Sequence, residues 1–312
     1  MNSIVLMFKR RQIILIIAVL APLAGLAVLV FGQANAVPTT ASPALANNYE
    51  RTVLESKFYY TTQFERSVKL AQSIDAPFPD APVRAGIIPH DITQGQFIAH
   101  FFQELASSKP NRIILIGPNH YETGSGMVQT TGADWRTAFG LVPADSAGID
   151  YLIERNYAKA DDQVAVEEHS IAAIVPFISY YLPDAKIVPL ILKSEIRLDE
   201  IKLLSDALDA LVDKNTIVLA AVDFSHYLTA FEAERNDAIT EKALQNLDSQ
   251  TILSFGQRFN DYVDSPPSIA LLLYWLSENS ISQSSILNHA NSGLLTGNLS
   301  APTTSYFEMA YY

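Results

Sequence analysis

The sequence predicts an α/β fold, in which one layered domain holds a largely buried sheet flanked by helices. Short apolar runs rich in Ile, Val and Leu recur along the chain with little polar alternation, which is typical of strands buried on both faces. Segments with helical periodicity separate these runs, and this alternation is typical of parallel sheets. Neither an internal repeat nor a second linker interrupts the pattern, so a single domain is expected over residues 49–312.

A helix over residues 49–74 is predicted first, followed by a proline-broken stretch at 75–83. The expected strands are short and apolar, and they cover residues 85–89, 112–117, 126–130, 186–192, 216–223 and 305–312. The expected helices fill the segments between the strands, and they cover residues 93–106, 148–155, 169–182, 198–212, 230–247, 251–259 and 267–278. The last of these starts beside two prolines, which suit the first turn of a helix.

Residues 1–36 have the features of a targeting segment. Basic residues at 9–11 precede an apolar run over 13–31, and small residues follow it. A signal peptide cleaved after Ala36 and a retained membrane anchor are both open, because the apolar run is longer than a usual signal core and nearly long enough to span a bilayer. Either would place the rest of the chain outside the cytoplasm, secreted or anchored. Residues 37–48 are rich in Pro, Ser, Thr and Ala and are predicted to form a flexible linker.

Composition and charge exclude several classes of function. The 312 residues carry a net charge of −12, and nucleic acid is not expected as a partner because its phosphates need a basic footprint. The absence of cysteine excludes disulfides, iron–sulfur clusters, cysteine nucleophiles and thiolate zinc sites. Any metal must therefore be held by His, Asp, Glu, backbone or water. A membrane is expected as a partner only through the N-terminal segment, because anionic lipids repel an acidic domain.

Three histidines share one position, just past the carboxyl end of a predicted strand: His90, His120 and His226. Ligands of open α/β sheets bind outside these strand ends, so the three side chains are expected to converge on one site. Imidazoles together with a carboxylate suit a divalent transition metal where thiolates are absent. Asp223, Asp261 and Asp264 are the candidate carboxylates. The alternative role for Asp223 is to orient a histidine, and the alternative role for Asp264 is to cap a helix.

The spacing of the other three histidines in the sequence does not predict that they bind a metal. Glu168 and His169 open a predicted helix, where acidic charge is favourable. His100 lies among apolar residues of a helix and is expected to be structural, whereas His289 falls in a polar stretch that is expected to be a loop. Ser225 lies next to a histidine, but a serine nucleophile is not expected without a G-x-S-x-G motif.

Several short motifs occur in a characteristic order, and they are Pro89-His90, Ile116-Gly117-Pro118-Asn119-His120, residues 135–140 (WRTAFG), Glu168-His169-Ser170-Ile171, Asp223-Phe224-Ser225-His226, Asn291-Ser292-Gly293 and Thr296-Gly297. In this order they resemble the Memo family, which includes the bacterial and archaeal proteins called AmmeMemoRadiSam system protein B. The resemblance runs from about residue 85 to the C-terminus. It implies a mixed-sheet fold similar to that of the class III extradiol ring-cleaving dioxygenases, which are non-haem iron(II) enzymes.

The resemblance also implies a set of ligands. Metal binding in the family is associated with the histidines that match His90 and His120 and with a cysteine about four residues before a proline. The strictly matching positions here hold tyrosine and valine, so Asp264 is expected to replace the cysteine, with Asp261 as the second choice. Two histidines and one aspartate form the triad typical of non-haem iron(II) sites.

The implied catalytic residues are His226, as the acid/base, and Asp223 beside it. Glu168 and His169 are expected to line the pocket or to orient the ligands. The sequence therefore predicts a Memo-like metal-binding protein, with iron(II) expected and copper or zinc as alternatives, and with dioxygenase-like oxidoreductase activity on an unknown small molecule. Two alternatives stay open: a non-catalytic binding or scaffold module, because the family thiolate is missing, and a metal-assisted hydrolase, which needs only an activated water on the same ligands.

Overall fold

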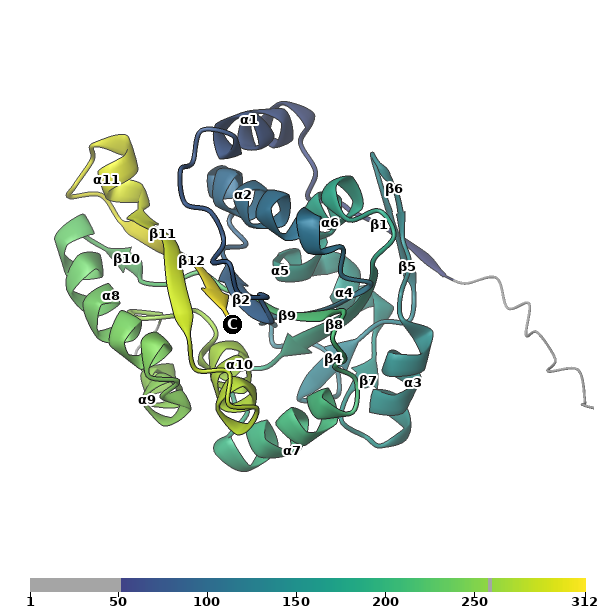
Figure 1. Ribbon diagram of the computed structural model, residues 1–312. Helices are drawn as coiled ribbons and strands as arrows, with labels where there is room; N and C mark the ends of the chain where they lie inside the picture. Colours follow the sequence, from purple (N-terminus) through teal and green to yellow (C-terminus); the bar gives the residue numbers. More distant parts are fainter. Residues whose placement is uncertain (1–51, 258–259) are drawn as a thin grey trace, which may run out of the picture. The chain divides into compact units, whose positions relative to one another are not determined.

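A mixed sheet of nine strands forms the centre of the part that the computed structural model describes, residues 52–257 and 260–312 (Figure 1). In spatial order its strands are β10 (His226–Leu228), β12 (Thr303–Tyr311), β2 (Ala85–Ile88), β9 (Thr216–Ala221), β3 (Arg112–Pro118), β8 (Lys186–Leu192), β4 (Val128–Thr130) and β7 (Lys159–Ala160), with β11 (Ser284–Asn291) also paired to β12. Strands β2, β9, β3 and β8 run parallel, whereas β12 and β4 run antiparallel to β2 and β8. The predicted mixed α/β fold is confirmed.

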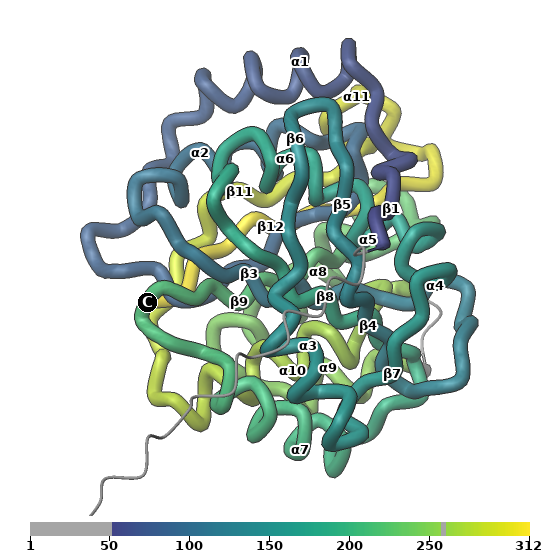
Figure 2. The backbone as a smooth tube through the Cα atoms, turned by 90° about the vertical axis from the view of Figure 1, so that its right-hand side faces the viewer, coloured from purple at the N-terminus to yellow at the C-terminus, as the bar shows by residue number. Residues whose placement is uncertain are grey.

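Helices cover both faces of this sheet (Figures 1 and 2). One face carries α1 (Thr61–Ala71), α2 (Gly95–Leu105), α4 (Asp162–Glu167), α5 (His169–Ala172) and α6 (Val175–Tyr181). The opposite face carries α3 (Ser146–Glu154), α7 (Leu198–Asp209), α8 (Ala230–Gln245), α9 (Ser249–Ser254) and α10 (Pro266–Glu278), while α11 (Ser292–Thr296) follows β11. Within the described residues, no helix combines the length and the apolar character that crossing a bilayer requires. The predicted targeting segment and linker lie outside the described residues.

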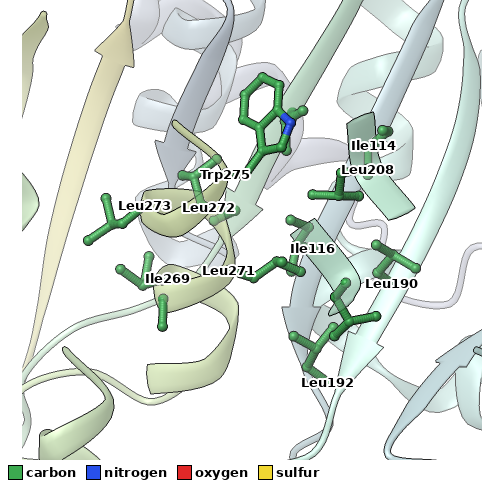
Figure 3. Packing of buried hydrophobic residues seen from close by; sticks show 14 of the residues in the cluster. Ile114, Ile116, Leu190, Leu192, Leu208, Ile269, Leu271, Leu272, Leu273 and Trp275 are labelled. Atoms are coloured by element: carbon green, nitrogen blue, oxygen red, sulfur yellow. The ribbon is translucent and has the colours of Figure 1, made fainter. Parts of the chain in front are cut away.

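The period-two alternation of the strands divides the apolar interior into two cores. Ile114 and Ile116 of β3 face α7 and α10, whereas Ile113 and Leu115 face α2 and α6. Figure 3 shows the first core, in which Leu271 of α10 lies beside Ile116 of β3. Fully burying one such side chain contributes about 1.5–3 kcal/mol, so packing on both faces holds the strands, and with them the strand ends, in fixed positions.

The predicted helix over residues 49–74 is wrong in its first part. Residues Val53–Glu55 form β1, which pairs in parallel with β5 (Asp134–Thr137) in a separate small sheet completed by β6 (Gly140–Val142). This pairing joins segments that are far apart in the sequence, and local periodicity does not contain that information.

Three smaller predictions also differ from the structure. The expected helix 169–182 is broken into α5 and α6, and Pro176, which lacks an N–H, occupies the first turn of the second helix. The expected helix 251–259 begins at Ser249 as α9 and ends in a 3-10 turn at Phe255–Gln257. His289 lies in β11 rather than in a loop, because β12 supplies the hydrogen bonds that its polar segment needs to form a strand.

Candidate metal centre

Five side chains that can bind a metal meet outside the carboxyl ends of the central strands. His90 follows β2, His120 follows β3 and Asp223 follows β9, while Asp264 precedes α10 and His169 opens α5. The ligand atoms of the three histidines lie within 4.8 Å of one another, and so do those of His90 and the two aspartates. The three residues that follow parallel strands therefore lie at one edge of the sheet, and Asp264 and His169 join them there.

The loop before α10 reaches this edge through backbone contacts with the segment after β9. Val263 forms an antiparallel bridge with Phe224, and the N–H of Asp264 donates to the carbonyl of Asp223 (3.1 Å). Pro266 then starts α10, whose apolar residues are buried on the sheet. The position of Asp264 is therefore fixed by the core on one side and by β9 on the other.

The spacing of His90, His120 and Asp264 matches that of ligands around one metal ion. The Oδ2 atom of Asp264 lies 3.2 Å from Nε2 of His90 and 3.5 Å from Nε2 of His120. Two ligand atoms that each bind a metal at about 2.1 Å, at angles near those of a tetrahedron or octahedron, are roughly 3 to 3.5 Å apart. These two distances are compatible with the binding of one divalent ion by all three side chains.

Asp264 also has an unsatisfied carboxylate. Its side chain is only 1% exposed, and neither oxygen accepts a hydrogen bond from the described part of the chain. A buried carboxylate without hydrogen bonds is costly, and metal coordination is one of the few ways to satisfy it. The donor set and this orphaned carboxylate fit a divalent transition metal.

Hydrogen bonds at Nδ1 orient both histidines so that Nε2 faces Asp264. The ring of His90 bonds through Nδ1 to the carbonyl of Ala221 (3.1 Å). The ring of His120 bonds through Nδ1 to Oε1 of Glu168 (2.8 Å), and the His120 backbone N–H donates to the other carboxylate oxygen (2.9 Å). Such partners fix the tautomer that presents Nε2 to a metal.

The neighbouring carboxylates raise the pKa values of both histidines. Burial alone would lower the pKa of His120, but the carboxylates of Asp264 and Glu168 outweigh burial and raise it to about 10. Burial opposes the charged form of His90 as well, yet Asp223 and Asp264 raise its pKa. The carboxylates thus create a strongly cation-attracting site.

His169 and Asp223 complete the immediate surroundings. The ring of His169 stacks on that of His120 with centroids 4.1 Å apart, and burial together with the charges of His90 and His120 lowers its pKa to about 4. His169 is therefore neutral and able to bind a metal. Burial raises the pKa of Asp223 to about 6, and its Oδ1 accepts the backbone N–H of His90 (3.0 Å). The side chains of His120 and His169, 25% and 32% exposed, form the side open to solvent.

Two other predicted residues lie beside this group rather than in it. His226 begins β10, and its Nδ1 contacts the carbonyl oxygen of Phe224. Its backbone N–H donates to the carbonyl of Asn260 (2.9 Å), in the loop that leads to Asp264. Asp261 does not belong to any group of potential ligands among the described residues.

A second cluster, which sequence reasoning missed, consists of Glu234, Asp237 and His289. Asp237 is fully buried, and its oxygens accept hydrogen bonds from Ser225 (2.7 Å), Ser305 (2.8 Å) and His289 (2.8 Å). Its charge is therefore satisfied by the protein, in contrast to that of Asp264. In the sequence, Asp237 is one aspartate within a predicted helix, and no motif connects it to Ser225, His289 or Ser305.

The comparisons with known proteins agree with this fold. The family model of the Memo-like proteins matches residues 54–309. A "MEMO1 family protein" of Methanobrevibacter smithii is 31% identical over 230 residues, which cover 71% of this chain and 80% of the relative. Another, from Caldivirga maquilingensis, is 28% identical over 233 residues, covering 72% and 82%.

A solved structure, that of the uncharacterized protein JW3007 from Escherichia coli K12, has a similar fold. It aligns with a TM-score of 0.51 and 15% sequence identity over 72% of this chain and 99% of its own. This likeness concerns the fold alone. The extent of the family match shows that the chain belongs to the Memo-like protein family.

Proposed function

We propose that this chain binds one divalent transition metal through His90, His120 and Asp264, with iron(II) as the expected ion. The buried carboxylate of Asp264 carries the proposal, because it has no hydrogen bond and lies at ligand spacing from two Nε2 atoms. Two imidazoles and one carboxylate on one side of an ion are typical of non-haem iron(II) sites.

The proposed activity is that of a dioxygenase-like oxidoreductase acting on a small molecule. An iron(II) ion in such a triad supplies redox chemistry at the positions that the protein leaves open. The partly exposed rings of His120 and His169 border the open side, where a substrate has access. His169, neutral through burial and its cationic neighbours, offers a planar surface there and no competing positive charge.

His226 and Asp223 are proposed to move protons. An imidazole is the commonest acid/base side chain in enzymes, and His226 follows Asp223 by three residues in the same segment after β9. The carboxyl group of Asp223 has a pKa raised to about 6, so it can also accept or release a proton near neutrality. Its hydrogen bond from the His90 backbone holds it beside the proposed ligands.

Metal analysis of protein purified without chelators tests the binding step. The wild type is expected to carry close to one equivalent of iron, copper or zinc, and Asp264→Asn and His120→Ala to carry little. His289→Gln serves as a matched control, because it removes a histidine that pairs with an aspartate outside the site. A metal-free wild type, or an Asp264→Asn variant with unchanged metal content, would overturn the proposal.

Oxygen consumption tests the reaction class. The iron-loaded chain is expected to take up oxygen with catechol-type compounds, and His226→Gln to lose this uptake while it keeps the metal. If the loaded chain consumes no oxygen with any such compound, the dioxygenase assignment is wrong, and a metal-binding module without this activity remains.

A further inference from the structure

A cavity of about 260 Å³ lies between α7 and the edge of the central sheet that β4 and β7 form. Figures 1 and 2 both show α7 below these two strands. None of the residues of the candidate metal centre lines this cavity. Pockets for drug-sized ligands hold about 300 to 1,000 Å³, so the cavity suits a somewhat smaller molecule.

The floor of the cavity is apolar and belongs to the core beneath α7. It is lined by side chains that are only 3% to 5% exposed, and these are Val128, Ala158, Ile196 and Leu204. Leu203, which also lines the cavity, is by contrast 56% exposed. An apolar group bound in the cavity would therefore extend the core and cover an exposed leucine.

Two opposite charges line the same cavity. The ammonium group of Lys159 on β7 has no hydrogen bond or ion pair within residues 52–257 and 260–312. Glu200 of α7 accepts the backbone N–H of Arg197 through Oε2 (2.9 Å), and no cationic side chain of the described segments pairs with it. The cavity thus offers an apolar floor together with one unpaired cation and one unpaired anion.

We propose that this cavity binds a free amino acid with a large apolar side chain, of the type of leucine or phenylalanine. The apolar side chain lies on the floor, the carboxylate pairs with Lys159 and the ammonium group pairs with Glu200. Charge-assisted hydrogen bonds of this kind are about twice as strong as neutral ones. A ligand with only one of the two charges would leave the other protein charge unpaired, so the donor set favours a zwitterion.

Equilibrium dialysis of the full-length chain against radiolabelled L-phenylalanine and L-leucine tests the proposal. At least one of the two is expected to bind saturably, at one equivalent per chain. The matching analogues without the ammonium group (3-phenylpropionate) or without the carboxylate (phenethylamine) are expected to compete roughly tenfold or more weakly than phenylalanine, because each loses one charged pair. Neither amino acid binding at millimolar concentration, or an analogue that competes as well as phenylalanine, would overturn the proposal.

Two variants locate the binding site. Lys159→Gln and Glu200→Gln are each expected to weaken binding roughly tenfold or more, and glutamine at position 200 can still cap the helix. Lys202→Gln and Asp199→Asn are the matched controls, because both residues are exposed on α7 and neither lines the cavity. Asp264→Asn is expected to bind the amino acid as the wild type does. Equal losses in variants and controls, or a loss in Asp264→Asn alone, would place the ligand elsewhere and contradict the proposal.

Discussion

At the residue scale, the carboxylates of Glu168, Asp223 and Asp264 have different roles in the candidate site. Glu168 holds the ring and backbone of His120, Asp223 holds the backbone of His90, and Asp264 alone is left without a hydrogen bond. The first two position the imidazoles and the third is free to bind an ion. A metal site with such support is preorganised, because the ligands need not be collected when the ion arrives.

Glu168→Gln is expected to weaken metal binding roughly 10- to 100-fold, because loss of the carboxylate removes the partner that fixes the tautomer of His120. Competition with a chromophoric chelator measures the affinity. Glu167→Gln is the matched control, since the neighbouring glutamate is half exposed and pairs with Lys57 instead. Equal affinities of the two variants would show that Glu168 has no such role.

Metal affinity is expected to rise with pH well beyond neutrality. The metal must displace protons from His90 and His120, and the pKa of His120 is raised to about 10 in the metal-free chain. Deprotonation on the alkaline side therefore favours binding up to that pKa. Calorimetric titrations at several pH values measure this dependence, and an affinity that levels off above the ordinary histidine pKa of 6.5 would contradict the account.

At the element scale, α8 holds the loop that carries Asp223 and His226. Asp237, buried in α8, accepts hydrogen bonds from Ser225 in that loop and from Ser305 on β12. His289 of β11 bonds to the other oxygen and stacks on Phe307 (4.3 Å). One carboxylate thus connects a helix, two strands and a loop of the site.

Asp237→Ala is expected to lower the free energy of unfolding by roughly 3 kcal/mol or more, because it leaves buried hydroxyls and a histidine without their partner. Urea unfolding followed by tryptophan fluorescence measures the loss. Glu241→Gln, on the same helix, should change stability by less than about 0.5 kcal/mol. A small loss for Asp237→Ala would mean that the network contributes little.

At the scale of the whole molecule, binding should stabilise the fold, because the ligands come from segments that meet only in the folded chain. At a free metal concentration of 100 times Kd, the gain is about 2.7 kcal/mol. The melting temperature of the loaded wild type is therefore expected to fall when a chelator removes the metal, and that of Asp264→Asn to stay unchanged. A chelator effect of the same size in both proteins would place the metal elsewhere.

The sequence predicted what local patterns encode. Apolar runs located the buried strands, and because parallel strands end at one edge, the positions after them placed His90 and His120 side by side. Features that depend on distant partners were not predictable: β1 forms only against β5, and the polar strand β11 only against β12. The stacking of His169 on His120 and the hydrogen bonds of Asp237 likewise join segments that no motif connects.

Anomalous diffraction at the iron edge, from crystals grown with iron(II) in the absence of oxygen, tests the central claim most directly. The account predicts one peak bound by Nε2 of His90, Nε2 of His120 and a carboxylate oxygen of Asp264, each at about 2.1 Å. A peak bound by His169 in place of Asp264, a peak only between Asp237 and His289, or no peak at all would contradict it.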